Sequence, residues 1–316
     1  MPKEALDDAL DGLRVRGSLL LHETYAPPWM IEIPPQRELA DLLGIAGNDR
    51  VVPFHIVRRG RFDLAVDDEP TRSIETHQVA ICASGRQHCM QHGTADAAVR
   101  IDKLLSGEAS LRANPDRTFA TELICGVFVL GATPLNPLLN ALPSVLTLDV
   151  ASPDADPILR QTTELLAAEL ARLRGATRSY TAERLLEIFF AEAVRSFAVT
   201  SDRNWFRGLN DPKIARALAV IHTNPGQAWT VNELATHVNL SPSRFAARFR
   251  DCLGETAIAY SKRRRIARAC ELLADAQSID AVAASVGYSN AASFTRAFRE
   301  LVGTTPARWS RNARSV

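Results

Sequence analysis

Apolar and polar residues follow two different patterns along the chain, and the change between them divides it. Between residues 13 and 148, short apolar stretches such as VVPFHIV, FDLAV and ELICGVFVL are separated by Pro, Gly, Asp and Asn. Short apolar stretches between turn-forming residues are typical of β-strands. We therefore expect residues 1–150 to form an all-β domain, a sandwich or small barrel of the jelly-roll type.

Beyond residue 156 the apolar residues recur at helical spacing instead. Two amphipathic helices are predicted within residues 151–207, with Leu166 and Leu170 on the first and Leu186 and Phe190 on the second. They either cover the β domain or pair with their copies in a dimer. Residues 208–316 are expected to be entirely helical, with Asp211 and Pro212 starting the first helix. The chain is thus predicted to be a multidomain α+β protein.

Two segments of this helical part are copies of each other. They read VNELATHVNLSPSRFAARFRDCLG and IDAVAASVGYSNAASFTRAFRELVG, about 49 residues apart. Each copy predicts a helix, a tight turn and a second helix, with Ser241 as N-cap in the first copy and Ser289 or Asn290 in the second. Two helix-turn-helix motifs are therefore expected, at about 229–254 and 278–303. The second helix of each can lie in a DNA major groove.

Positive charge is concentrated in the same part of the chain. Residues 212–316 contain 15 Lys and Arg against 7 Asp and Glu, whereas residues 1–211 contain 22 against 29. Only the C-terminal part is therefore suited to approach phosphates. A basic segment alone is equally consistent with a solvated surface, so the charge indicates DNA binding only together with the repeat.

The segment from Lys213 to Trp309 resembles the DNA-binding domain of the AraC/XylS family of transcription regulators. The run SVGYSNAASFTRAFRELVGTTPARWSR carries the resemblance, through its Gly-Tyr turn, its two spaced Phe residues and its Gly-x-x-Pro exit. The resemblance implies sequence-specific binding to double-stranded promoter DNA. It also implies contact with RNA polymerase and, in most cases, activation of transcription.

The resemblance also assigns DNA contacts to exposed positions of the second helix of each motif. They are Ser243, Arg244, Ala246, Ala247 and Arg250 in the first motif, and Asn290, Ala292, Ser293, Arg296 and Arg299 in the second. Arg296 is the strongest candidate for a base contact, because a guanidinium can pair with guanine O6 and N7. Ala246 and Ala247 could touch thymine methyl groups, whereas Arg250 and Arg299 are expected to clamp phosphates.

The N-terminal part resembles the cupin-like regulatory domain of one branch of that family, through WMIEIP, VVPFHIVRRGRFDL, GRQHC and ICGVFVL. The resemblance implies that His55, His88 and Cys125 converge near the barrel mouth, where two imidazoles and a thiolate suit Zn²⁺. Alternatively, His55 is a buried strand histidine and Cys125 a small core residue. Three further histidines are held in reserve as ligands: His22, His77 and His92.

The sequence leaves two alternatives to a metal ion as the signal for this sensor domain. Cys89 and Cys125 are candidates for thiol oxidation, since His88 and Arg86 beside Cys89 could lower the pKa of its thiol. The third possibility is a small organic effector bound in the barrel.

Other classes of protein are less consistent with the sequence. The chain has no HxH pair followed by Glu, no G-x-S-x-G and no phosphate loop, so we predict that it is not an enzyme. A cupin-type metalloenzyme fused to a DNA-binding domain and an unselective DNA-binding protein remain the alternatives. The sequence shows neither a membrane span nor a signal peptide, and its five cysteines lack CxxC spacing. We expect a cytoplasmic regulator that acts as a homodimer.

Overall fold

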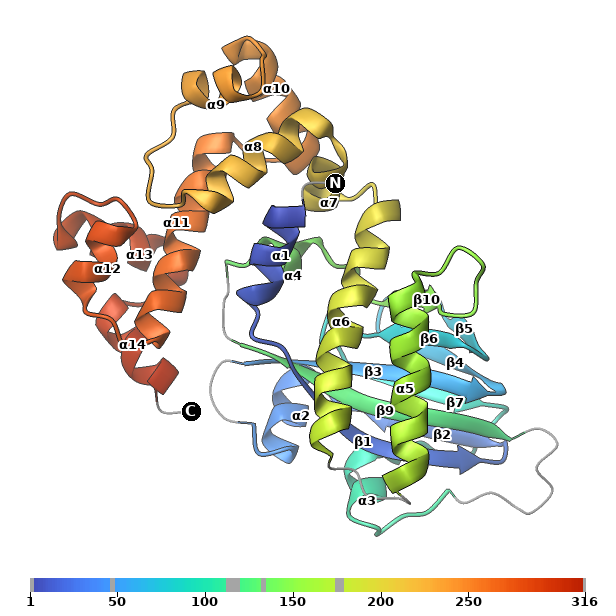
Figure 1. Ribbon diagram of the computed structural model, residues 1–316. Helices are drawn as coiled ribbons and strands as arrows, with labels where there is room; N and C mark the ends of the chain where they lie inside the picture. Colours follow the sequence, from blue (N-terminus) through green and yellow to red (C-terminus); the bar gives the residue numbers. More distant parts are fainter. Residues whose placement is uncertain (1–2, 46–48, 112–119, 132–134, 174–178, 315–316) are drawn as a thin grey trace. The chain divides into compact units, whose positions relative to one another are not determined.

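The computed structural model describes residues 3–45, 49–111, 120–131, 135–173 and 179–314. They form two compact units (Figure 1). The sheet unit consists of Val15–Leu130 and Leu142–Phe197, and the helical unit of Met1–Arg14, Gly131–Ala141 and Ala198–Val316. The sequence-based division at residues 150 and 207 did not place the first residues of the chain, or residues 131–141, with the helical part.

The sheet unit contains two five-stranded sheets. One has the order β1 (Arg16–Tyr25), β9 (Thr121–Leu130), β3 (Arg50–Arg59), β6 (Gln78–Ile81), β10 (Leu146–Asp149). The other has the order β5 (Arg72–Glu75), β4 (Arg61–Val66), β7 (His88–His92), β2 (Trp29–Ile33), β8 (Val99–Arg100). Apolar side chains of both sheets form one core, including Leu21, Val57, Phe62 and Met90. The predicted β fold is thus confirmed as a sandwich, and its described strands do not close into a barrel.

Strands β3 and β9 form the centre of the first sheet and are buried along almost their whole length. Their antiparallel register places His55 opposite Cys125 and Phe54 opposite Gly126. Successive side chains of a strand point to opposite faces. His55 and Cys125 therefore point into the sandwich, while Phe54 stacks on Phe128 on the outer face, with ring centroids 4.6 Å apart.

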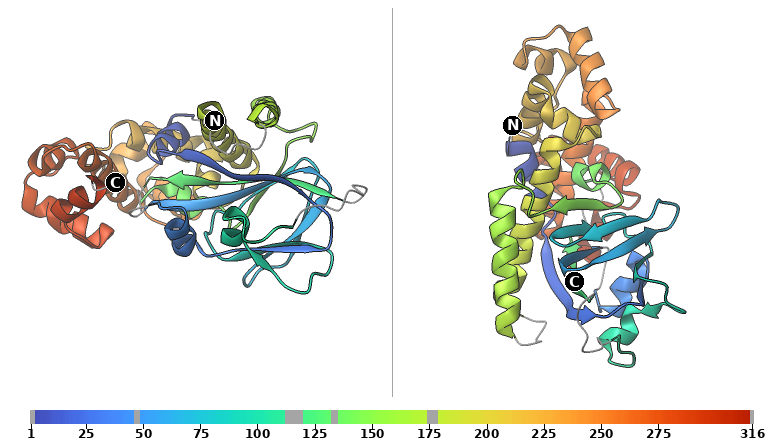
Figure 2. Two further views of the ribbon diagram at one scale, coloured as in Figure 1. Left: turned by 90° about the horizontal axis from the view of Figure 1, so that it is seen from below. Right: turned by 90° about the vertical axis from the view of Figure 1, so that its right-hand side faces the viewer.

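Helices α5 (Pro157–Leu173) and α6 (Tyr180–Thr200) lie side by side over that outer face (Figure 2). Phe189 and Phe190 of α6 are fully buried, and Phe190 contacts Phe128 of β9 with centroids 4.9 Å apart. These helices therefore cover the β sandwich, the first of the two roles predicted for them. The sheet unit also contains the short helices α2 (Gln36–Leu42) and α3 (Ile101–Leu105).

The helical unit includes two helix-turn-helix motifs. Helices α9 (Val231–His237) and α10 (Pro242–Leu253) form the first, and α12 (Ile279–Ser285) and α13 (Ala291–Val302) the second. The long helix α11 (Ala257–Ala274) joins them, so that the motifs lie near its two ends (Figure 1). The other helices of this unit are α1 (Lys3–Asp11), α4 (Pro137–Ala141), α7 (Asn204–Asn210), α8 (Pro212–Thr223) and α14 (Pro306–Arg314).

Local capping signals fix where these helices begin. The Asp211 side chain accepts hydrogen bonds from the backbone N–H groups of residues 213 and 214, and Pro212 follows at the first helical position, as predicted. Ser241 caps α10 in the same way. In the second motif Asn290, rather than Ser289, caps α13, because its side chain accepts the N–H of Ser293.

The tight turns between the paired helices require a left-handed residue. Asn239 supplies it in the first motif at φ 54°, and Gly287 in the second at φ 75°. A Cβ atom on Gly287 would lie only 1.8 Å from the carbonyl oxygen of Gly226. Glycine is therefore needed at this turn for both its conformation and its lack of a side chain. Asn239 shows that a left-handed turn alone does not demand glycine.

None of the helices in the described parts of the chain is long and apolar enough to span a membrane.

Replacing Gly287 by alanine should destabilise the second motif. The left-handed conformation costs about 1–2 kcal/mol for a residue with a side chain, and the contact with Gly226 adds to that cost. Gly303→Ala is the matched control, because Gly303 has φ 78° and open space around it. Urea denaturation of both variants should show the larger loss of stability for Gly287→Ala. Equal losses would mean that the backbone relieves the clash.

Candidate functional site

The second helix of each motif presents an apolar face inward and a polar face to solvent. In α10, Phe245 and Phe249 are fully buried, and in α13, Phe294 and Phe298 are. The ten positions predicted to contact DNA lie on the opposite faces. Nine of them are exposed, and Ala246 is partly buried. The structure therefore places the predicted residues where a groove of DNA could reach them.

Side chains on the outer face of α13 differ in the hydrogen bonds and ion pairs that they form. Asn290 Oδ1 accepts the Ser293 N–H at 2.8 Å, and Ser293 Oγ donates to the Asn290 carbonyl at 2.9 Å. Both side chains thus support the start of the helix. Arg296 is exposed and has no ion-pair partner among the described residues. It lines a shallow depression together with Ala291, Ala292, Thr295, Arg299, Glu300 and Thr305. Of the residues that line it, only Ala292, Arg296 and Arg299 were predicted from the sequence.

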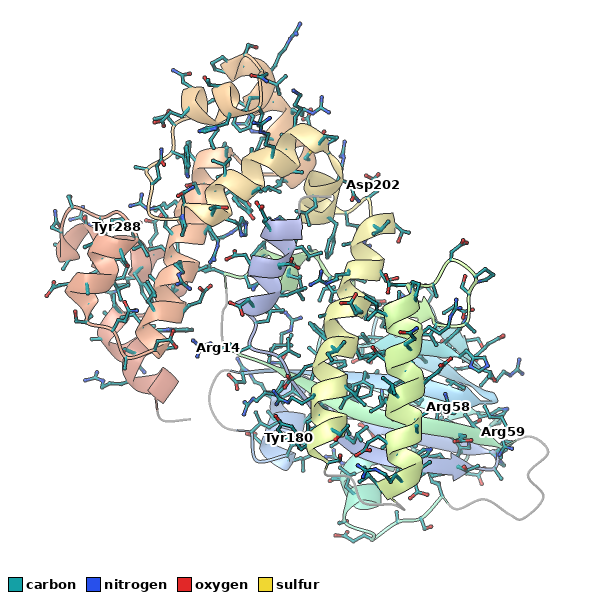
Figure 3. All side chains as sticks on the ribbon, viewed as in Figure 1. Arg14, Arg58, Arg59, Tyr180, Asp202 and Tyr288 are labelled. Atoms are coloured by element: carbon teal, nitrogen blue, oxygen red, sulfur yellow. The ribbon has the colours of Figure 1, made fainter. Side chains whose placement is uncertain are left out.

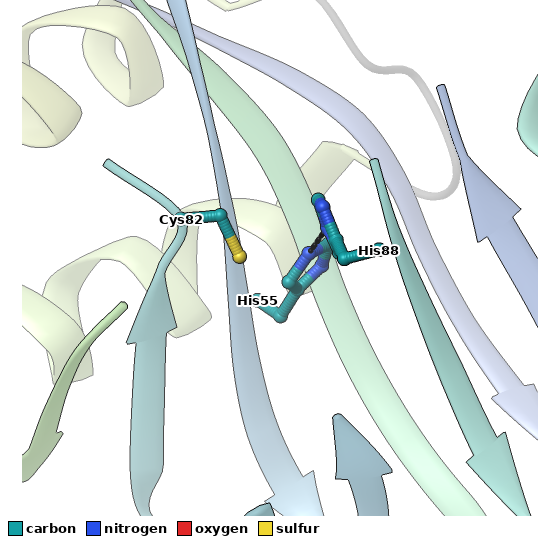
Figure 4. Close-up of side chains that lie close together, drawn as sticks. All are labelled: His55, Cys82 and His88. Carbon is teal, nitrogen blue, oxygen red and sulfur yellow. Dashed lines mark hydrogen bonds between the residues drawn. The ribbon is translucent and has the colours of Figure 1, made fainter. Parts of the chain in front are cut away.

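Inside the sheet unit, two histidines and a cysteine converge. His55 comes from β3, His88 from the start of β7, and Cys82 directly follows β6 (Figure 4). All three are buried, and one ligand atom from each lies within 4.8 Å of the others. These residues could hold a metal ion. The prediction named Cys125 in place of Cys82.

Cys125 contacts the same histidine from the other ring nitrogen. His55 Nδ1 is 3.2 Å from Cys125 Sγ, whereas His55 Nε2 is 2.9 Å from His88 Nε2. One imidazole cannot direct both nitrogens at one ion. The geometry therefore groups Cys82 with His55 and His88 and places Cys125 at the Nδ1 side of His55.

Cys125, His55, His88 and the carbonyl of Arg86 form a chain of hydrogen-bonded groups. The Arg86 carbonyl at its end determines where the protons lie. His88 Nδ1 lies 3.2 Å from the Arg86 carbonyl oxygen, which can only accept, so His88 carries its proton on Nδ1. His88 Nε2 is then an acceptor for His55 Nε2–H, and His55 Nδ1 accepts from the Cys125 thiol. Every group in the chain is neutral and has a partner.

Burial favours these neutral forms. It lowers the pKa of His88 to about 4 and that of His55 well below its ordinary value, with the neighbouring His88 adding to the effect on His55. Burial also raises the pKa of Cys82 to about 12 and raises that of Cys125. Both imidazoles can thus act as metal ligands at neutral pH. The thiols need a nearby cation to lose their protons.

Comparison with known proteins places both parts of the chain. A cupin family model matches residues 4–198, and a helix-turn-helix domain model matches residues 234–312. The AraC family membership is therefore clear. The chain is an AraC-type transcription regulator with an N-terminal cupin domain.

Two relatives with whole-length similarity agree with this assignment. The chain is 28% identical to the HTH-type transcriptional regulator AlkR of Acinetobacter baylyi, over 80% of this chain and 85% of AlkR. It is 29% identical to an AraC-like transcription regulator of Streptomyces lividans, over 96% of each chain. ToxT of Vibrio cholerae is a structural neighbour at 10% identity and a TM-score of 0.38, covering 97% of this chain and all of ToxT.

The suggestion that His88 and Arg86 lower the pKa of Cys89 is not supported. Burial together with Glu32 and Asp67 instead raises the pKa of Cys89. Its neighbour His88 points into the sandwich, so strand alternation directs Cys89 to the opposite face, away from Cys125.

The basic residues of α11 do not simply face solvent. Each has a partner within the helical unit. Lys262 pairs with Glu300, Arg263 with Glu255, Arg264 with Asp8 and Glu271, and Arg268 with Glu271, while Arg265 donates to the carbonyl of Val286. Arg265 also lies over the ring of Tyr288. Tyr288 is labelled in Figure 3. Much of the positive charge thus stabilises the fold.

The reserve histidines lie outside the cluster. His22 pairs with Glu122 at 3.2 Å, and His92 Nδ1 contacts Thr121 Oγ1 at 2.9 Å. His77 occupies a turn at φ 68°. Cys82, in contrast, was missed as a ligand because its sequence position identifies it only as the end of an apolar strand.

Replacing Arg296 by alanine should relax DNA specificity at one base pair. A bidentate contact to guanine discriminates by about 1–3 kcal/mol, so we expect about a 5- to 150-fold loss of preference there. Binding sites would first be selected from random duplexes with the wild-type protein, and affinities then measured on single-base variants. The matched control is Arg299→Ala, which should weaken binding evenly across sequences and reduce its salt dependence. An even loss for Arg296→Ala would make Arg296 a phosphate contact.

Proposed function

We propose that this AraC-type regulator is a one-component transcription activator whose input is Zn²⁺ bound in the sheet unit. The observation that carries the proposal is the convergence of His55, Cys82 and His88 in a fully buried position. Regulated binding to promoter DNA, with contact to RNA polymerase, is the output expected of the helical unit.

The donor set fits zinc better than other common cations. Two imidazole nitrogens and one thiolate sulfur are borderline-soft ligands, which favour Zn²⁺ over the oxygen-seeking Mg²⁺ and Ca²⁺. Three protein ligands leave a fourth position open. A sensor site with an open position can exchange its ion or accept a further ligand.

Cys125 has a separate role in this proposal. When His55 Nε2 binds the ion, its proton moves to Nδ1, where the Cys125 sulfur 3.2 Å away can accept it in a hydrogen bond. Groups that hydrogen-bond the second nitrogen of a ligating histidine orient its ring. Cys125 would then position His55 without touching the metal. The set His55, His88 and Cys125 stays as the alternative.

A small organic effector has separate support from a hollow beside β1. This hollow of about 480 Å³ is lined by leucines of β1, α3 and α5, among them Leu20, Leu104 and Leu170, with His22 and Glu23 at its polar side. A lining with polar and apolar parts of similar extent suits a small molecule that has both polar and apolar groups. Thiol oxidation at Cys89 or Cys125 lacks comparable support, because the pKa of both thiols is raised.

The proposal includes a homodimer formed through α5 and α6. These helices expose large apolar residues: Ile158, Leu165, Tyr180 and Ile188. Tyr180 is labelled in Figure 3. Exposed apolar groups on adjacent helices favour association with a like surface.

Purified protein should contain about one zinc per chain. Elemental analysis should show that His55→Ala and Cys82→Ser lose the metal. Cys125→Ser should keep it with about 10- to 100-fold weaker affinity, as expected for loss of an orienting group. Cys89→Ser is the matched control and should bind normally.

Two results would contradict this assignment. Metal-free wild-type protein, prepared without chelators, would remove zinc as the input and direct attention to the hollow beside β1. Loss of zinc in Cys125→Ser with retention in Cys82→Ser would restore the set His55, His88 and Cys125.

Replacing Leu165 by aspartate should shift the protein from dimer to monomer. Leu165 is 57% exposed in the single chain, and a charge there opposes burial against a second copy. Sedimentation over a range of concentrations measures the shift. Leu42→Asp is the control, since Leu42 is 44% exposed on α2. Unchanged association of Leu165→Asp would place the dimer contact elsewhere.

A further inference from the structure

The first helix of the chain, α1, is part of the helical unit although it precedes the cupin strands in the sequence. Its inward face is formed by Ala5, Leu6, Ala9 and Leu10, and Leu13 follows, all of them buried. A helix of this length is marginal alone, so α1 depends on the packing it finds against α8 and α4.

The Asp8 carboxylate of α1 joins two helices of the helical unit. One of its oxygens accepts a hydrogen bond from Arg264 Nη2 of α11 at 2.8 Å, and the other accepts one from His222 Nδ1 of α8. The Arg264 side chain is only 6% exposed, and its Nη1 donates to Glu271 at 3.0 Å. Asp8 thus supplies one of the two carboxylates that neutralise a buried guanidinium.

The hydrogen bonds continue from His222 into the core of the unit. With Nδ1–H directed at Asp8, His222 Nε2 accepts the Tyr260 hydroxyl proton at 2.6 Å, and the Tyr260 oxygen accepts Trp205 Nε1–H at 2.8 Å. Tyr260 also packs against Phe249 of the first reading helix, with ring centroids 5.9 Å apart. The network therefore reaches from α1 to the core beneath α10.

Charge within this network is arranged to hold Asp8 ionised. Burial by itself would raise the pKa of Asp8, but the hydrogen bond from His222 and the charge of Arg264 together lower it. Removing the Asp8 charge would leave Arg264 buried with Glu271 as its remaining partner. Breaking one member of a buried ionic group is costly, because the other charge stays out of water.

Two further contacts fix α1 in place. Asn136 Nδ2 donates to the Ala9 carbonyl at 2.7 Å, so the segment that follows β9 holds the end of α1. A Cβ on Gly12 would lie 3.1 Å from Glu271 Oε1, which shows how closely the turn after α1 approaches α11.

We propose that α1 is a structural part of the DNA-reading machinery and that Asp8 is a positioning residue for it. Through Arg264 on α11 and His222 on α8, Asp8 holds the helix that joins the two motifs, and so fixes the spacing at which they meet DNA. The inference is independent of zinc, because it concerns only the helical unit.

The test is the tolerance of the protein to altered spacing on DNA. Duplexes selected with the wild-type protein, in which both motifs engage, would be compared with duplexes carrying two extra base pairs between the two contacted segments. Asp8→Asn should reduce the preference for the selected spacing by about tenfold, equivalent to 1.4 kcal/mol. Affinity for DNA carrying one contacted segment should stay unchanged. Asp11→Asn, an exposed acid on the same helix, is the matched control.

A second measurement checks whether the helix itself is released. Amide hydrogen exchange of residues 3–11 in the full chain should accelerate in Asp8→Asn and not in Asp11→Asn. Faster exchange with unchanged spacing preference would overturn the positioning role. Unchanged exchange would show that Asp8 does not hold α1, and the proposal would fail at its first step. If Asp8→Asn lowered single-segment binding equally, the loss would be general destabilisation, which also contradicts it.

Discussion

The antiparallel pairing of β3 with β9 is the constraint on which the sheet unit depends. One register sets His55 against Cys125 inside the sandwich and Phe54 against Gly126 outside it. A shift of one residue would exchange the two faces of the strand. Both the histidine–cysteine cluster and the surface against which α6 packs would then be lost. Gly126 permits this register, because a Cβ there would lie 2.6 Å from Phe54 Cζ. The packing of α6 and the chemistry of the cluster thus have one structural cause.

The helix-turn-helix motifs could be predicted from sequence because their signals are local. Asp211 and Ser241 act on N–H groups two or three residues away, and the phenylalanines four residues apart define the buried side of each reading helix. Such signals fall within one or two turns of helix. The side chains of α11 are the contrary case. Arg264 is flanked by other basic residues and looks solvent-exposed, yet its partner Asp8 lies 256 residues away.

The cluster of His55, Cys82 and His88 could be predicted only in part. His55 and His88 were predicted through family resemblance, whereas Cys82 became a candidate only when β6 was placed beside β3. The sequence indicates the burial of α1 less clearly. Ala5, Leu6, Ala9, Leu10 and Leu13 recur at helical spacing, a pattern that the all-β prediction for residues 1–150 did not take into account. The pattern says that one face is covered, but it does not say that the cover is α8, which begins some two hundred residues later in the chain.

The neutral hydrogen-bond chain through Cys125, His55, His88 and Arg86 bears on what kind of metal site this cluster could be. Structural zinc sites contribute folding energy outright, because without the ion their thiolates and imidazoles lack partners. Here, both imidazoles have hydrogen-bond partners within the protein. Zinc would have to displace the His55 to His88 hydrogen bond and take a proton from Cys82, so its net affinity would be lower than the donor set alone would give. Lower affinity and proton release on binding are properties of an exchangeable site. Hydrogen bonds that compete with an ion for both imidazoles therefore favour a sensing role over a permanent structural one.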